Sequence, residues 1–183
     1  MFARHRLTVA AYYRMAATGV IGRDARVELI RGEIVDMAPM GTRHSGVLMR
    51  LNNWVAAAVG SQAHVSSQTP LRLDDSSEPE PNLMVLKPRA DFYIEAHPSA
   101  ADVLLLIEVS DTSARYDREI KLPLYAQAGV PEVWIVDLDA GLLRCHRDPL
   151  GTEYTQMQAL AQPGRLAVPG LNGVQVKLDG LFS

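Results

Sequence analysis

The chain lacks several features that would assign it to a specialised class of protein. Its 183 residues include a single cysteine, Cys145, so no disulfide can form within the chain. No apolar run reaches the roughly 20 residues of a membrane-spanning helix, and the basic residues near the start precede no apolar segment of the kind that a secretory signal needs. A net charge of -3 excludes binding of nucleic acid through bulk positive charge, but it leaves room for a local basic groove. We therefore expect a cytoplasmic protein without a membrane segment.

What is present is the composition of an ordinary globular protein. Hydrophobic residues make up 48% of the chain and charged residues 21%, and the sequence contains no internal repeat. A chain of this length suffices for one domain with its own core, so we expect residues 1–183 to form a single domain.

The pattern in residues 103–137 predicts a strand, a helix and a second strand. Residues 103–107 are an unbroken run of branched apolar side chains, which is typical of a strand buried on both faces. Turn and capping oxygens follow at 111–113, a helical pattern covers 117–128 and ends at Gly129, and another apolar strand runs from 133 to 136. Two strands joined by a helix usually lie parallel in one sheet, so these two are expected to be parallel neighbours.

The rest of the chain gives shorter elements, which are separated by Gly, Pro and polar residues. Helices are expected at 9–15, capped by Thr8, and at 47–59; strands are expected on both sides of a tight turn at Arg31 and Gly32, and at 64–68, 71–73, 82–86, 142–147, 153–158 and 174–178.

Three polar residues occupy the positions that a metal-dependent hydrolase needs. Asn82 begins a strand after a proline, Glu108 ends the buried strand, and Lys121 lies on the next helix. Mg2+ takes oxygen ligands, usually one or two carboxylates, and a nearby lysine can orient water or stabilise developing negative charge. The spacing alone is a weak signal, because carboxylates end strands in many proteins and most helical lysines face solvent.

Longer motifs resemble a known family. The segments EPEPNLMVL at 78–86 and DVLLLIEVSDTSARYDREIKLPLYAQAGVPEVWIVD at 102–137 are similar to the Uma-type restriction endonuclease family, a branch of the PD-(D/E)XK nuclease superfamily. The early ELIRGEIVDM and the helix that begins near His44 belong to the same pattern. The resemblance implies an α/β (α+β) protein with a restriction-endonuclease-like mixed β-sheet flanked by helices. It also implies an endonuclease that uses Mg2+ or Mn2+ and acts on nucleic acid, with DNA favoured over RNA.

The resemblance also assigns roles to single residues. In the superfamily a proline-aspartate motif gives one metal ligand, the acidic residue of the next strand gives a second, and a lysine completes the site. Glu108 matches the second ligand, Ser110 stands where many relatives carry the lysine, and Lys121 is the expected substitute. Glu28 matches the early glutamate of the pattern and is expected to be catalytic, like Glu108, Lys121 and Asn82, and Asn82 replaces the metal-binding aspartate.

Asn82 leaves two functions open. An amide oxygen can bind a cation but lacks the charge that matters to a hard dication, and Glu80 has the right parity to compensate if the backbone around Pro81 is extended. The chain is therefore either a Mg2+-dependent endonuclease, with Asn82 and Glu108 at the metal and Lys121 beside the reacting water, or a nuclease-fold domain that binds nucleic acid or a protein partner without cutting. We also expect a homodimer, since a small chain needs a second active site to cut both strands.

Glu28 and His44 also have simpler interpretations. Glu28 can be a strand carboxylate that pairs with Arg31 or Arg50. His44 stands at a helix start, where a histidine more often caps or faces solvent than acts as a base, and only the resemblance makes it a candidate for the site.

Overall fold

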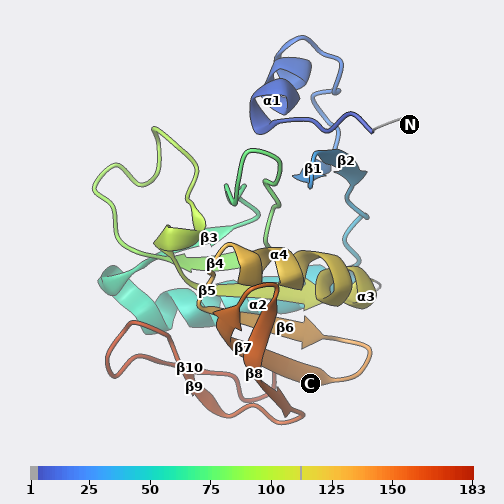
Figure 1. Ribbon diagram of the computed structural model, residues 1–183. Helices are drawn as coiled ribbons and strands as arrows, with labels where there is room; N and C mark the ends of the chain where they lie inside the picture. Colours follow the sequence, from blue (N-terminus) through green and yellow to red (C-terminus); the bar gives the residue numbers. More distant parts are fainter. Residues whose placement is uncertain (1–3, 112) are drawn as a thin grey trace.

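A six-stranded mixed sheet forms the centre of the computed structural model, which describes residues 4–111 and 113–183 (Figure 1). The expected capping role of Thr112 lies outside the described residues. The strand order is β3-β4-β5-β6-β7-β8. The strands are β3 (His64–Ser67), β4 (Leu83–Leu86), β5 (Val103–Ser110), β6 (Glu132–Asp137), β7 (Leu142–Leu150) and β8 (Glu153–Leu160).

The two central strands are parallel, as the sequence predicts. β5 pairs with β6 in parallel register, with Glu108 opposite Ile135, while the other neighbouring strands of this sheet are antiparallel. Every residue of β6 and all but Leu104 in β5 are buried. β5, which is apolar apart from Glu108 and Ser110 near its end, therefore lies in the middle of the sheet, and it carries the Glu108 carboxylate into the interior.

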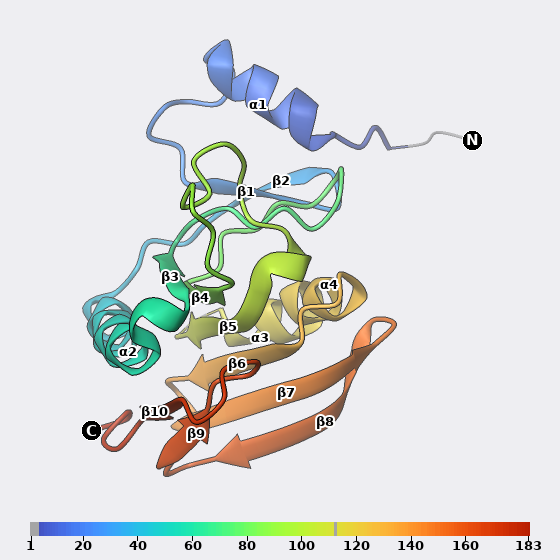
Figure 2. The same ribbon diagram turned by 90° about the vertical axis from the view of Figure 1, so that its left-hand side faces the viewer.

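Helices cover both faces of the sheet (Figure 2). On one face, α2 (Thr42–Val59) packs Leu51 and Val55 into a core with Ile107 and Trp134. The same core takes in the hairpin of β9 (Arg165–Ala167) and β10 (Gln175–Lys177). On the other face, α4 (Leu122–Gln127) buries Tyr125. The expected mixed sheet flanked by helices is confirmed.

The N-terminal part adds a helix and a hairpin at the end of the molecule away from β9 and β10 (Figures 1 and 2). α1 (Val9–Ala17) is capped by Thr8, whose hydroxyl accepts a hydrogen bond from the Ala11 N–H. β1 (Val27–Ile30) and β2 (Glu33–Asp36) are joined by Arg31 and Gly32, both with positive φ, as expected for a two-residue hairpin turn. A Cβ on Gly32 would lie 2.8 Å from the Cβ of Arg6, so this turn requires glycine.

The helix after β5 starts earlier than expected and is irregular. α3 (Ala114–Tyr116) leads into the π-helical segment η3 (Asp117–Lys121) and then into α4. The N–H of Leu122 donates to the carbonyl of Asp117, five residues back, and Pro123 has no N–H to continue a regular ladder. The expected capping by the side chain of Ser113 is wrong, because this hydroxyl donates to the carboxylate of Asp117 instead.

The prediction of a strand at 71–73 is also wrong. Arg72 forms only an isolated bridge with Ser99, while the N–H groups of Leu71 and Leu73 donate to the carbonyls of Pro79 and Ser77. The segment therefore folds back on its own polar connector rather than joining a sheet. Two short 3-10 helices, η1 (Gly60–Gln62) and η2 (Ala100–Asp102), complete the elements of the described residues. None of the helices in these ranges is long and apolar enough to cross a membrane.

Candidate active site

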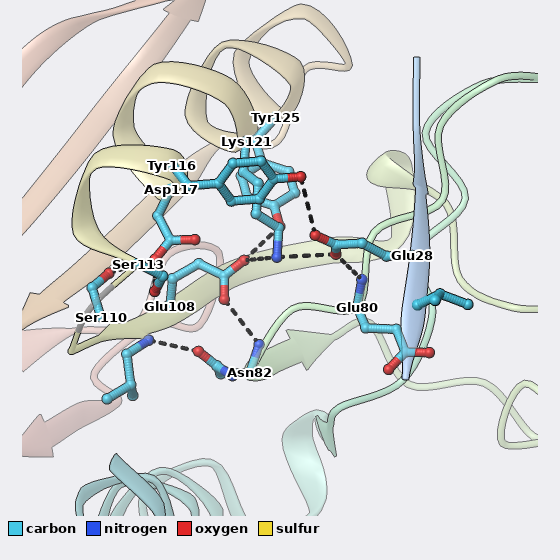
Figure 3. Close-up of polar contacts among 12 residues, drawn as sticks. Glu28, Glu80, Asn82, Glu108, Ser110, Ser113, Tyr116, Asp117, Lys121 and Tyr125 are labelled. Carbon is cyan, nitrogen blue, oxygen red and sulfur yellow. Dashed lines mark hydrogen bonds and ion pairs between the residues drawn. The ribbon is translucent and has the colours of Figure 1, made fainter. Parts of the chain in front are cut away.

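Glu108, Lys121 and Glu28 meet as a buried triad of charges between β5, η3 and β1 (Figure 3). The Nζ atom of Lys121 lies 2.9 Å from Oε1 of Glu108 and 3.3 Å from Oε2 of Glu28. Each of the three residues is only 3–4% exposed. Burial alone would lower the pKa of the Lys121 ammonium, but the Glu108 and Glu28 carboxylates outweigh it and hold that pKa above its usual value. The lysine is therefore charged.

Two tyrosines and two backbone amides, those of Glu80 and Asn82, hold these carboxylates in place. The Tyr125 hydroxyl donates to Oε1 of Glu108 at 2.6 Å, and the N–H of Glu80 donates to Oε2 of Glu28 at 3.1 Å. The Tyr116 hydroxyl reaches Oε1 of Glu28 at 3.4 Å. Burial first, and the Glu108 charge second, raise the pKa of Tyr125 far above its usual value, so it donates its proton throughout the physiological range.

The cation that pairs with Glu28 is Lys121 and not, as the simpler interpretation has it, Arg31 or Arg50. Arg50 instead donates to the backbone carbonyls of Gly180 and Ser183. This places Glu28 beside Glu108 rather than on the surface of a strand.

Asn82 joins the ends of β4 and β5. Its N–H donates to Oε2 of Glu108 at 3.1 Å, and its Oδ1 accepts from the N–H of Val109 at 2.8 Å. Since the Val109 N–H can only donate, the amide oxygen must face it, which orients the Asn82 side chain. The NH2 end is then the part of this side chain that is left for the space around it.

These residues lie at the base of a cavity of about 460 Å³. It is bounded by β1, the connector between β2 and α2, the start of α2, and the segment from β5 to η3. Six carboxylates and two cations line it: Glu28, Asp36, Glu80, Glu108, Asp111 and Asp117, with Arg26 and Lys121. The cavity is therefore acidic. Burial first and the neighbouring Glu28 charge second raise the pKa of Glu80, whose side chain lies in this wall.

Asp117, where the sequence pattern predicts that the helix begins, is a further residue of the site. It is 5% exposed, and its Oδ2 accepts from the hydroxyls of Ser110 and Ser113, each at 2.7 Å. Burial, followed by the nearby Glu108 charge, raises its pKa to about 6. Ser110, which stands where many relatives of the resemblance carry lysine, thus serves as a donor to Asp117.

A signal for Asp117 and Tyr125 is present in the sequence. Positions 113, 117, 121 and 125 are spaced by four residues and therefore fall on one face of a helix. If Lys121 faces the site, Asp117 and Tyr125 on the same face should also lie near it. The sequence interpretation considered Lys121 alone and missed them.

His44 lies on α2 and also lines the cavity. Its Nε2 is buried and has no hydrogen-bond partner within the described residues. Burial lowers the pKa of this imidazole, and the charges of Glu108 and Asp111 only partly offset it. A neutral histidine therefore stands at the cavity wall, and a role in catalysis stays a prediction.

Comparisons with known proteins place the chain in a family. The model of the Uma2 family, described as "Putative restriction endonuclease", matches residues 9–179. The chain belongs to this family. A crystal structure of "a putative nuclease belonging to DUF820" from Anabaena variabilis ATCC 29413 is similar over 96% of this chain and 97% of that one, with a TM-score of 0.73 and 15% sequence identity. That likeness concerns the fold. Among curated proteins no match was found.

Restriction-endonuclease-like families generally use a divalent metal, and the side chains at this site of the Uma2 member only partly suit one. No group of three or more His, Cys, Asp or Glu side chains that could hold a metal ion occurs at 4–111 or 113–183. The expected ligands, Glu108 and Asn82, both face the cavity and offer oxygen. Glu108 Oε2 and Asn82 Oδ1 each accept one hydrogen bond, which leaves each oxygen a second lone pair. The donor type suits Mg2+ or Mn2+, and what the pair lacks is charge.

Proposed function

We propose that this Uma2 member is an endonuclease that hydrolyses phosphodiester bonds of DNA with Mg2+ or Mn2+, and that Asn82 keeps its activity low. The observation that supports this proposal is the buried ion pair of Lys121 with Glu108 at the base of a cavity that Asn82 also lines. DNA is favoured over RNA by the family's description as restriction endonucleases.

Glu108 and Asn82 would hold the cation, which when bound supplies a Lewis acid for the scissile phosphate and its attacking water. Lys121 contributes a fixed positive charge. Because Glu108 and Glu28 hold its ammonium from two sides, the amine stays charged and can orient the water or stabilise the negative charge that develops on phosphate. Glu28 acts through Lys121, as a positioning residue.

The test is nicking of supercoiled plasmid by the protein with Asn82, by Asn82→Asp, and by Asn82→Asp with Glu108→Gln. Each is assayed with Mg2+, with Mn2+ and with chelator. Asn82→Asp restores the missing ligand charge and should raise metal-dependent nicking by at least about a hundredfold, because each ligand of one ion is needed for its function. Glu108→Gln in that background should abolish the gain. Strong chelator-sensitive nicking by the Asn82 protein would instead mean that Asn82, or Glu80 in its place, is a competent ligand.

A second candidate function is a nuclease-fold domain that binds nucleic acid or a protein partner without cutting. It is favoured by one contact: the amide oxygen of Asn82 already accepts a hydrogen bond from the Val109 N–H, so only one lone pair of this uncharged oxygen is left for a cation. Absence of nicking by Asn82→Asp on every substrate, with no gain in metal affinity, would decide for this function.

We further propose a cytoplasmic homodimer in which residues 1–183 form one domain. The free and buried Cys145 is consistent with a reducing compartment. The support for a dimer is β8, an edge strand of the central sheet, which is exposed at every residue except Tyr154 and Leu160.

A further inference from the structure

The charged groups of the candidate site lie deep in the protein. Glu28, Glu108, Lys121 and Asp117 are each only 3–5% exposed, although all four line the cavity. A substrate atom that reaches them must enter the cavity. With about 460 Å³, this cavity falls within the range of about 300–1,000 Å³ that is typical of sites for small ligands.

One wall of the cavity is apolar, which a phosphate does not require. The segment 35–41, which comprises the end of β2 and the connector to α2, contributes only one charged side chain to the lining. Its apolar members are Val35, Met37, Ala38, Pro39 and Met40. The Met40 side chain is 37% exposed, so part of this wall faces outward. Methionine side chains are flexible and polarizable, so they can pack against the flat rings of different nucleobases.

The charges around the opening disfavour a duplex. Arg26 and Asp36 are exposed, and Glu80 and Asp111 are partly so; Arg26 is the one cation among these four. Duplex DNA carries one negative charge per about 1.7 Å of helix axis, so it would bring a row of phosphates to an acidic rim. An unpaired nucleotide brings one or two phosphates, which Arg26 and a bound cation can balance.

The charged groups lie deep in the cavity, one wall is apolar and the opening is acidic. We therefore propose that the nucleotide at the scissile bond enters the cavity unpaired, with its base against the wall formed by residues 35–40. The substrate is then single-stranded DNA, an unpaired end or a locally unpaired stretch such as a negatively supercoiled plasmid presents, and not an intact relaxed duplex. This inference rests on the proposed function but is separable from it, because binding can be measured without cutting.

The first experiment measures binding of the Asn82 protein by fluorescence anisotropy in Ca2+ and in chelator. The probes are a fluorescein-labelled single strand, the same strand as a blunt duplex, and a hairpin with an unpaired tail. We expect the single strand and the tailed hairpin to bind at least about tenfold tighter than the blunt duplex, since contact with one base is worth about that much. A blunt duplex that binds as tightly as the single strand, or no binding of any probe, would overturn the inference.

The second experiment examines the wall. Met37→Gln and Met40→Gln keep the length of the side chain and make it polar, and each should weaken single-strand binding about tenfold. Met49→Gln is the matched control, since Met49 is 67% exposed on α2 and does not line the cavity; it should leave binding unchanged. Equal effects of the three substitutions, or no effect of the two wall variants, would count against a base at this wall.

The third experiment separates this inference from the chemistry. In the Asn82→Asp background, cleavage of single-stranded DNA is compared with hydrolysis of bis(p-nitrophenyl) phosphate, a phosphodiester without nucleobases. The wall variants should lower DNA cleavage about tenfold more than hydrolysis of the small diester. If no diester is hydrolysed while single strands still bind selectively, the endonuclease proposal fails and the inference about the bound strand stands. If the duplex is cut as fast as the single strand, the endonuclease stands and this inference fails.

Discussion

The Nζ atom of Lys121 lies 2.9 Å from Oε1 of Glu108, and this ion pair ties the π-helical segment to the end of the central strand β5. Glu28 shares the same ammonium from the hairpin at the other side. A hairpin from the N-terminal part of the chain thus meets β5 and the helical segment that follows it at one cation, so a change at Lys121 should affect stability as well as activity.

Lys121→Gln should lower the free energy of unfolding by about 3–5 kcal/mol, because it leaves two buried carboxylates without their cation. Urea denaturation at neutral pH measures the change. Lys177→Gln is the control: its side chain is 68% exposed, and its replacement should change stability by less than about 0.5 kcal/mol. A loss for Lys121→Gln as small as that of the control would show that solvent reaches the carboxylates.

Asp117 should make stability fall as pH rises. Burial, then the Glu108 charge, raise its pKa from 3.8 to about 6 in the folded protein. Between these values the folded state binds more protons than the unfolded state, so the free energy of unfolding decreases with pH, by about 3 kcal/mol in all. The stability gained from the protonated Asp117 is complete below about pH 4 and lost above about pH 6.

The measurement for Asp117 is the melting temperature against pH for the protein and for Asp117→Asn. The variant stays neutral and retains an oxygen for Ser110 or Ser113, so the stability of the protein relative to the variant should fall as pH rises across this window. Taking the difference removes the contributions of other titrating groups. Parallel curves would mean that Asp117 has the same pKa in the folded and the unfolded protein.

Much of the fold is predictable because its central pattern is local. The apolar run of β5, the helix after it and the apolar run of β6 follow one another in the sequence, and they specify parallel neighbours. The predicted strand at 71–73 failed for the opposite reason: its N–H groups bond to a connector that folds back on it, which a period-two pattern does not reveal.

The candidate site was predictable only where a motif marks it. Asn82, Glu108, Lys121 and Glu28 all line the cavity, as the resemblance implies, although their roles stay predictions. Lys121 pairs with Glu28, which lies in a hairpin more than ninety positions earlier in the chain. From side-chain chemistry alone, Arg31 and Arg50 were equally good partners for Glu28. A long-range ion pair of this kind leaves no periodic pattern in the sequence from which it could be predicted.

The homodimer is expected to form through the exposed edge of β8. This strand of eight residues contains one charged side chain, Glu153, at its start, and no proline. Edge strands of monomers usually carry charges, prolines or bulges that prevent pairing with a second copy. Light scattering across a range of concentrations should therefore show a dimer.

Met157→Lys, at a position 59% exposed in mid-strand, should weaken the dimer at least about tenfold, whereas Met49→Lys on α2 should not. A monomer at every concentration would contradict the expectation.

Asn82→Asp should convert a weak cation site into a strong one. In the variant one carboxylate oxygen can keep the hydrogen bond from Val109, and the other replaces the NH2 group, so a second negative charge lies beside Glu108. Without metal the two carboxylates repel each other, and the melting temperature should fall. With Mg2+ both charges bind one ion, and a ligand at about a hundred times its Kd adds about 2.7 kcal/mol of stability.

Thermal unfolding with and without Mg2+, together with calorimetric titration, measures this effect independently of any nuclease activity. Mg2+ should raise the melting temperature of Asn82→Asp more than that of the Asn82 protein and bind to the variant at least about tenfold tighter. Asn53→Asp is the matched control, since Asn53 is exposed on α2 and the change adds the same charge away from the cavity. Equal Mg2+ stabilisation of both variants would mean that the ion responds to net charge alone, and the assignment of Asn82 and Glu108 as its ligands would fail.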